Sequence, residues 1–481
     1  APKAPSPLAA SSATALRPLP RVPDSHWHDA PAGPNHLERL PPAVLEAGLS
    51  QCRGNRDGLR RMLLRLARNE SVTIALWGGS MPAGHGCTEA ADPVTRWRGC
   101  EGPGCGVCAG PRCMCSYGLM VARRLQRTFP GAKVSFYNNA EGGYTSSSHV
   151  YKMAAVEYAR VGQGAPDLVI LDHGANDKAL PKSHVQASLE TSIRLLRCLH
   201  PCAQLAVTAS VPTEHHVPPE VASWYLEVAR HYGLPLVSPV QAEFVAAKEG
   251  AKFWDPPNIF HPKWKTHAYI ADLFARALNA EEASLERDAA AGAAAECASD
   301  VKFDRRSFAC EDPFPRFSKE DLLRQYEAYC LDPLSIYVAD GLEHSTVRLD
   351  QPRIPADRSW TLKDDALKKK GWISEKVTNN PLSFEVRFGP KPRLVVAYLK
   401  TYEFVGQADL RLKGMRGGYL LDGRWEDKTS QAYLFHSQAD APFAPGPKGD
   451  YARDRPNGLG VEPNSRGVVE ITLTKGPKFK K

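Results

Sequence analysis

The chain has 481 residues and contains no stretch of 18 consecutive apolar residues, so the sequence predicts no membrane-spanning helix. It also has no recognisable nucleic-acid-binding motif and no internal repeat. The charge excess is small: 61 Lys and Arg residues stand against 53 Asp and Glu residues, and the basic ones are dispersed. We therefore expect no nucleic-acid partner. The basic surface is expected to be simply solvated, and the alternative is that it favours acidic partners such as sulfated or uronic polysaccharides.

The composition is that of a globular protein too long for one ordinary domain, with 43% hydrophobic and 24% charged residues. Pro, Ala and Ser dominate the beginning of the sequence, and an alanine-rich segment interrupts its middle. The predicted organisation has four parts, which are an N-terminal tail at 1–35, a first domain at 36–284, a linker at 285–300 and a β-rich accessory domain at 301–481.

Twelve cysteines are unevenly distributed, and six of them lie in an insertion at 87–115. Clustered cysteines in even number are typical of disulfides in an oxidising compartment. Zinc is the alternative, because Cys105 and Cys108 have the spacing of metal ligands, although Cys113 and Cys115 are too close together for the usual second pair. We predict disulfides and no metal site, with zinc or free thiols as alternatives, and the sequence does not determine the pairing.

The N-terminus and one glycosylation sequence favour the same compartment. The sequence begins Ala-Pro-Lys-Ala-Pro-Ser-Pro without an apolar signal core, as a mature chain or a luminal stalk does. Asn69-Glu70-Ser71 is an acceptor sequence for N-glycosylation. We expect a glycoprotein that is secreted, on the cell surface or in the Golgi lumen.

Short apolar runs alternate with helical patterns in the first domain. The runs are Val72–Trp77, Val134–Tyr137, Leu168–Leu171, Leu205–Val207 and Leu234–Val237. The helical patterns lie near 117–129, 147–160, 187–199, 220–232, 239–249 and 265–279. Such alternation predicts an α/β fold of three layers, with a doubly wound parallel sheet between two layers of helices.

The accessory domain has strand-like periodicity instead. Its apolar segments are Leu334–Val338, Leu382–Phe388, Leu394–Leu399, Ala408–Leu412 and Val468–Leu473. They predict a β-sandwich or a jelly roll. Its aromatic residues either stack on sugar rings or pack in the core, and they are Trp360, Trp372, Tyr398, Tyr402, Trp425 and Tyr433.

Four short blocks of polar residues and glycines follow the apolar runs of the first domain. They are Gly78-Gly79-Ser80, Asn138 to Gly143, Gly174-Ala175-Asn176-Asp177 and His261-Pro262. The first three stand directly after predicted strands, at the sheet edge where open α/β folds bind ligands. A serine, backbone N–H groups, an amide side chain and a loop histidine at one edge can form a nucleophile, an oxyanion site and a base.

This combination resembles the SGNH hydrolase superfamily, also called GDSL-type hydrolases, over residues of about 70–280. The resemblance implies that Ser80 is the nucleophile and, through its backbone N–H, the first oxyanion donor. It makes Gly143 and Asn176 the second and third donors and His261 the general base. It also implies that no metal ion or organic cofactor is needed.

Residues beside these blocks are expected to support them. Asp177 is expected to hold its block by hydrogen bonds. His267 is less favoured as the base than His261 because it falls inside a predicted helix. His85 and His173 either pack in the interior or line the pocket.

Two positions depart from the family pattern. The family usually has Gly-Asp-Ser where this chain has Gly-Gly-Ser, and that aspartate is mainly structural. The family's Asp-x-x-His is Asn258-Ile-Phe-His261 here, and an amide supplies no negative charge to an imidazolium; in a well-studied triad this exchange costs about 10⁴ in rate. Asp255 is the candidate third member of the triad and Asn258 the alternative, while some members of the superfamily work as Ser–His dyads.

We therefore predict an extracytoplasmic SGNH-type serine esterase that acts on acylated, in particular O-acetylated, carbohydrate. An acyl-enzyme would pass its acyl group to water or to a sugar hydroxyl. The expected partner is a polysaccharide or a glycoprotein glycan, and membership of a larger extracellular assembly is left open. The alternative is a catalytically degenerate SGNH scaffold that serves as a structural or carbohydrate-binding glycoprotein.

Overall fold

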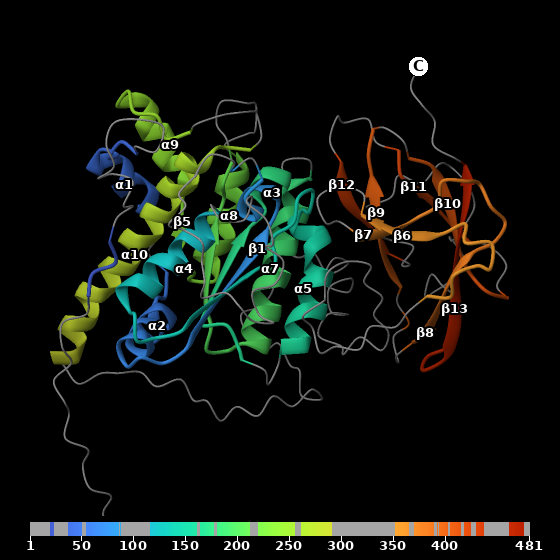
Figure 1. Ribbon diagram of the computed structural model, residues 1–481, viewed down its shortest axis with the longest axis horizontal. Coiled ribbons are helices and arrows are strands. Elements are labelled where there is room, and N and C mark those ends of the chain that lie inside the picture. The colour runs from blue at the N-terminus through green and yellow to red at the C-terminus, as the bar shows by residue number, and fades with distance from the viewer. Residues whose placement is uncertain are drawn as a thin grey trace, which may run out of the picture.

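The computed structural model has an α/β lobe and a β lobe (Figure 1). The residues that it describes are 20–23, 37–50, 54–85, 87, 116–160, 164–177, 180–211, 220–254, 261–290, 352–364, 370–388, 392, 394–402, 405–414, 418–424, 430–436 and 461–475. Most of the predicted tail, nearly all of the cysteine-rich insertion and the strand expected at Leu334–Val338 lie outside these residues.

A five-stranded parallel sheet forms the centre of the α/β lobe. Its order is β2-β1-β3-β4-β5, the order of a doubly wound flavodoxin-like sheet. The strands are β1 (Val72–Gly78), β2 (Val134–Asn138), β3 (Leu168–Asp172), β4 (Gln204–Thr208) and β5 (Leu236–Val237). All five coincide with predicted strands within two residues at each end, and the predicted fold class is confirmed. Their nearly continuous apolar runs are explained by burial on both faces.

Helices cover both faces of this sheet (Figure 1). One layer contains α1 (Pro42–Leu49), α2 (Asp57–Ala67), α4 (Tyr117–Thr128), α9 (Pro239–Lys248) and α10 (Trp264–Ala290). The other layer contains α5 (Ser146–Arg160), α7 (Lys182–Leu199) and α8 (Glu220–His231). Two single-turn helices, α3 (Ser80–Ala83) and α6 (Gly174–Asp177), follow β1 and β3 directly. Each face of the sheet therefore has its own apolar core.

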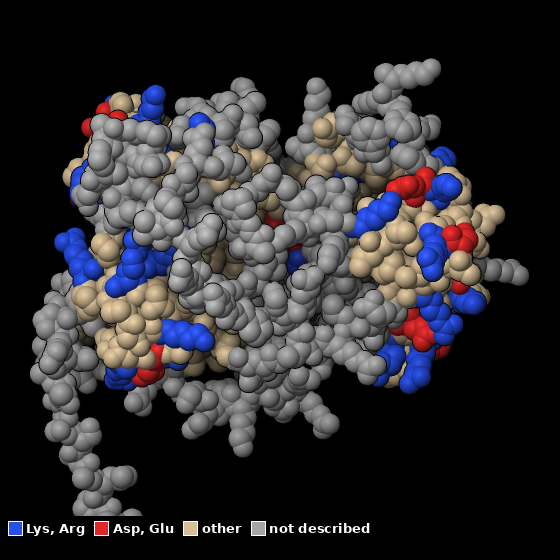
Figure 2. All heavy atoms as spheres, in the orientation of Figure 1, with Lys and Arg blue, Asp and Glu red and all other residues tan. Residues whose placement is uncertain are grey.

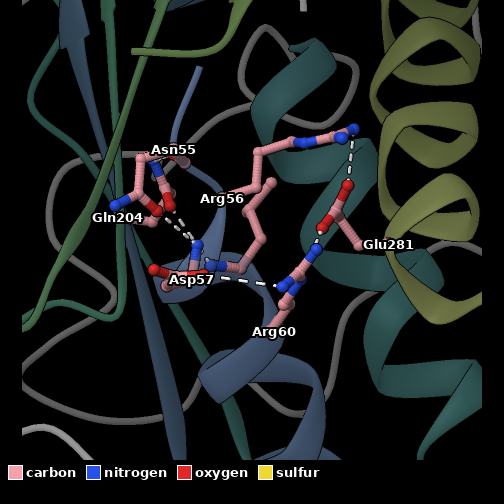
Figure 3. Close-up of polar contacts among 7 residues, drawn as sticks. Asn55, Arg56, Asp57, Arg60, Gln204 and Glu281 are labelled. Atoms are coloured by element: carbon pink, nitrogen blue, oxygen red, sulfur yellow. Dashed lines mark hydrogen bonds and ion pairs between the residues drawn. The ribbon is translucent and has the colours of Figure 1, made fainter. Parts of the chain in front are cut away.

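Helix α10 continues to Ala290, so the segment 285–300, predicted as a linker, begins inside a helix. Its extension is tied to α2 by Glu281, whose side chain is fully buried. Glu281 forms ion pairs with Arg56 and Arg60, and the Nε of Arg60 lies 3.1 Å from its carboxylate (Figure 3). A buried carboxylate needs such partners, and this need fixes the far end of α10 against α2.

The β lobe consists of antiparallel strands, as its alternating pattern predicts. A four-stranded sheet has the order β11-β10-β13-β8, and two strand pairs accompany it. Its strands are β8 (Leu382–Arg387), β10 (Gln407–Leu412), β11 (Tyr419–Asp422) and β13 (Arg466–Lys475), and the pairs are β9 (Val395–Lys400) with β12 (Gln431–His436) and β6 (Thr361–Asp364) with β7 (Lys370–Ile373). Val386, Leu410 and Val469 of the large sheet share one apolar core with Phe435 of β12. The β9–β12 pair therefore covers one face of the large sheet.

Packing accounts for two of the aromatic residues in this lobe. Trp360 is buried beside Trp372, and its indole N–H donates to the Asn380 carbonyl. Tyr402 is 36% exposed, and Trp425 lies outside the described residues. On the face drawn in Figure 2, basic side chains are scattered over both lobes together with acidic ones, in keeping with the dispersed charge of the sequence.

Among the described cysteines, Cys87 and Cys202 each belong to a disulfide. The pairing within the insertion remains a prediction. No described helix is both long and apolar enough to cross a bilayer. No cluster of metal-ligating side chains occurs within the described residues either, and most of the insertion is not among them.

Replacing Glu281 by alanine leaves Arg56 and Arg60 without their buried partner, so we expect the free energy of unfolding to fall by about 2–4 kcal/mol. The control is Lys182→Ala, which breaks an exposed ion pair with Glu227 and should cost less than about 1 kcal/mol. Urea denaturation followed by far-ultraviolet circular dichroism measures both. Equal costs for the two variants would show that the tie between α2 and α10 is unimportant.

Candidate active site

The first three blocks meet at the carboxyl edge of the parallel sheet. Ser80, Gly143 and Asn176 lie in the segments that leave β1, β2 and β3, and these three strands are neighbours. Strand β1 lies between the other two, and its last residue, Gly78, pairs with Asp172 of β3. Adjacent parallel strands end at the same edge, so the topology collects the blocks without any long loop.

The turn after β1 brings the serine and the amide together. A Cβ atom on Gly79 would lie only 2.3 Å from Asn176 Nδ2, so the amide occupies the space that a side chain at this position would need. The Gly79 N–H donates to the Asp172 carbonyl at 3.0 Å, and Ser80 then begins α3. Asn176 Nδ2 donates to the Tyr144 carbonyl at 2.8 Å. Because an amide nitrogen carries two N–H groups, the second one is left to bind an oxyanion.

The loop after β2 is fixed to the same turn. The Glu141 N–H donates to the Gly78 carbonyl at 2.9 Å, and the Tyr144 N–H to the Glu141 carbonyl at 3.3 Å. Gly143 has a φ of +80°, which a residue with a side chain rarely adopts. Within the part of the chain that the structure describes, neither the Gly143 N–H nor the Ser80 hydroxyl makes a hydrogen bond. Both groups can therefore act on a ligand.

His261 lies just before α10 and reaches the site edge through His85. The two imidazole rings are 5.5 Å apart. The backbone N–H of His85 donates to the Ser80 carbonyl at 3.1 Å, and the imidazole ring of His85 lies against Gly142. The fourth block therefore lies on the same edge as the other three, with His85 between its histidine and the loop after β2.

The third member of the predicted triad lies outside the described residues. Asp255 and Asn258 both belong to the segment 255–260, so the choice between them remains a prediction. His267 is fully buried in α10, where its ring stacks on Tyr117. Burial lowers the pKa of His267 to about 3, which makes it a poor proton acceptor and fits the preference for His261 as the base.

Two buried carboxylates hold the segments that carry the site residues. Asp177 accepts hydrogen bonds from the Ser146 N–H at 2.7 Å and from the Tyr225 hydroxyl, so it joins its own block to the start of α5. This confirms the expected supporting role of Asp177. Asp172 accepts from Tyr117 at 2.9 Å. Burial raises the pKa of Asp177 to about 7 and that of Asp172 to about 6.

A buried histidine pair was not foreseen from the sequence. His149 Nδ1 and His173 Nε2 are 2.8 Å apart, and the His149 ring packs between Trp77 and Tyr144. Burial lowers the pKa of both imidazoles, that of His173 to about 3, so both are neutral. Of the two roles considered for His173, packing is the one observed. No sequence motif predicts that His149 pairs with His173, because the pair forms only when α5 packs beside the segment that follows β3.

Comparison with known proteins gives a family for the α/β lobe. Residues 76–269 match the model of the GDSL-like Lipase/Acylhydrolase family. This range includes all four blocks and leaves the β lobe unassigned. No curated protein sequence matches the chain.

Solved structures show a shared fold over both lobes. A two-domain esterase (CEX) active on acetylated mannans covers 89% of this chain and 92% of its own, with a TM-score of 0.51 and 18% identity. A two-domain esterase (CEX) active on acetylated mannans and co-crystallized with mannopentaose covers 89% of this chain and 94% of its own, with a TM-score of 0.51 and 17% identity. The lipase/acylhydrolase from Enterococcus faecalis covers 44% of this chain and 96% of its own, with a TM-score of 0.31 and 17% identity.

The raised pKa of Asp177 predicts a pH-dependent stability. Below about pH 4 the carboxyl is protonated in both folded and unfolded chains. Between pH 4 and pH 7 the unfolded chain ionises while the folded chain keeps the proton, so the free energy of unfolding falls as the pH rises. Relative to Asp177→Asn, the wild type should lose on the order of a few kcal/mol over this range. Urea unfolding at pH 4, 5.5 and 7 tests this, and parallel profiles would contradict it.

Proposed function

We propose that the α/β lobe, whose residues 76–269 form a domain of the GDSL-like lipase/acylhydrolase family, is a serine esterase that removes acetyl groups from carbohydrate. The observation that carries this proposal is the contact at the end of β1. Asn176 Nδ2 lies 2.3 Å from the position that a Cβ atom on Gly79, the residue before Ser80, would occupy. A nucleophile and an oxyanion donor are thereby held next to each other by the backbone itself.

In the proposed reaction Ser80 Oγ attacks the ester carbonyl and His261 takes up the hydroxyl proton. The N–H groups of Ser80 and Gly143 and the second N–H of Asn176 stabilise the negative oxygen that forms. Collapse of the tetrahedral intermediate releases the sugar hydroxyl, with its proton supplied by His261. Water then attacks the acyl-enzyme and releases acetate, or a sugar hydroxyl attacks it and the acetyl group is transferred.

Three observations support a carbohydrate ester as the substrate. The similar two-domain esterase acts on acetylated mannans. The oxyanion donors and the nucleophile stand at an open sheet edge beside a second, β-rich lobe. The net charge of +8 suits a polysaccharide or glycan that carries acidic groups. The cysteine-rich insertion and the Asn69 sequon favour an extracellular or Golgi-lumen setting, where such substrates occur.

Ser80→Ala should abolish both acetate release from acetylated mannan and labelling by a fluorophosphonate, because the Ser80 hydroxyl is the group that forms the covalent adduct in the proposed reaction. Asn176→Ala should keep the nucleophile but lower kcat by about 10²–10³, the usual cost of one oxyanion donor. The matched control is Ser223→Ala, which removes a helix-surface serine that bonds only to Glu220. Full acetate release by Ser80→Ala would refute the assignment of the nucleophile.

The acid of the triad is tested by comparing two variants. If Asp255 orients and stabilises His261, Asp255→Asn should lower kcat by up to about 10⁴, whereas Asn258→Ala should have a small effect. Steady-state kinetics on p-nitrophenyl acetate measures both. A large loss in Asn258→Ala alone would assign the role to the amide, and small losses in both would indicate a Ser–His dyad.

Absence of labelling and of acetate release in the wild type would support the alternative function. The chain would then be a degenerate scaffold with a structural or carbohydrate-binding role. Binding of deacetylated and acetylated mannan to the full chain, measured by affinity electrophoresis, would separate these two roles.

A further inference from the structure

Strand β12 of the β lobe contacts the loop that carries the proposed oxyanion donor Gly143. Strand β12 pairs with β9 on one side, and on its other side the Ala432 N–H donates to the Gly143 carbonyl at 3.1 Å. Strand β12 also lies against α5, the helix that follows the Gly143 loop. In Figure 1, β12 stands on the side of the β lobe that faces α3 and α5.

The geometry of the strand pair shows that this bond is directed out of the sheet. In an antiparallel pair the N–H and C=O groups of one residue point to the same side, alternately toward and away from the partner strand. Because the Ala432 N–H reaches Gly143, the pair of Ala432 with Leu399 is one without hydrogen bonds. Ala397 of β9, opposite Leu434, belongs to the same set, so its N–H also points away from the partner strand.

The bond restrains a glycine of the loop whose φ is positive. Glycine occupies positive and negative φ almost equally well, so the φ of +80° at Gly143 must be held by its surroundings. On one side, Glu141 is bonded to the Gly78 carbonyl, and on the other, the Tyr144 carbonyl is bonded to Asn176. Between these two points lies the peptide group of the Gly143 carbonyl and the Tyr144 N–H. Its N–H makes a bond of 3.3 Å to the Glu141 carbonyl, and Ala432 holds its carbonyl from the β lobe.

We propose that Ala432 is a positioning residue, whose backbone N–H holds the Gly143 loop in the conformation that aims the Gly143 N–H at the oxyanion. This inference rests on the proposed function and extends it, because it makes docking of the β lobe a condition for full activity. The two lobes then form one catalytic unit, in which the β lobe acts on turnover and not only on substrate affinity.

Proline at position 432 removes the N–H and leaves the β9–β12 ladder intact, since an outward-pointing position on an edge strand tolerates proline. Ala432→Pro should lower kcat on p-nitrophenyl acetate by about three- to tenfold, the worth of one net hydrogen bond, with little change in KM. Hydrogen exchange in the segment 139–145 should become faster. The matched control is Ala397→Pro, at the equivalent outward-pointing position of β9, which should leave both quantities at their wild-type values.

The conservative variant Ala432→Ser keeps the N–H, so its kcat should exceed that of Ala432→Pro severalfold. Equal kcat and equal exchange in Ala432→Pro and Ala397→Pro would overturn the proposal while the esterase function stands. If the wild type hydrolyses no ester, the proposed function fails, and exchange in segment 139–145 still decides whether Ala432 holds the loop. If Ala432→Pro does not fold, single-residue exchange in the wild type decides, because the Ala432 amide must exchange more slowly than that of Ala397.

Discussion

The close approach of two backbones at the ends of β1 and β3 is the constraint on which the site depends. A Cβ atom on Gly78 would lie 2.0 Å from the Asp172 carbonyl, and one on Gly79 would meet the Asn176 amide. With two glycines the strands can end in contact, and the Gly79 N–H bonds to the Asp172 carbonyl. The start of α3 at Ser80 is consequently placed by the main chain, and the Asn176 amide is held beside it by its bond to the Tyr144 carbonyl.

Beneath that contact the protein uses polar groups that burial keeps close to neutral. Burial brings the pKa of Asp177 to about 7 and that of His173 to about 3, so neither carries a full charge near neutral pH. Neutral groups can form hydrogen bonds in the interior without the desolvation cost of an ion. The supporting layer therefore fixes geometry while it leaves electrostatic stabilisation to the N–H donors.

The sequence was sufficient for features that depend on local order. Buried strands have continuous apolar runs, and the blocks that follow them stay at the strand ends, so the sheet and the arrangement of Ser80, Gly143 and Asn176 at one edge could be predicted. The continuation of α10 past residue 279 could not, because Glu281 there forms ion pairs with Arg56 and Arg60, far away in the sequence. The pairing of His149 with His173 could not be predicted either, because the two histidines belong to different segments that only the fold brings together. Local patterns contain no information about which distant segment supplies a partner.

The hydrogen bond between β12 and the Gly143 loop stabilises an exposed strand edge and a glycine loop at the same time. An edge strand exposes unpaired N–H groups that invite association with other chains, and a glycine loop with positive φ is costly to order. A hydrogen bond from the one to the other satisfies both needs with groups that each lobe already possesses. The same bond makes the order of the loop depend on the docking of the β lobe. The order of a loop in the first lobe is in this way set by a backbone group of the second.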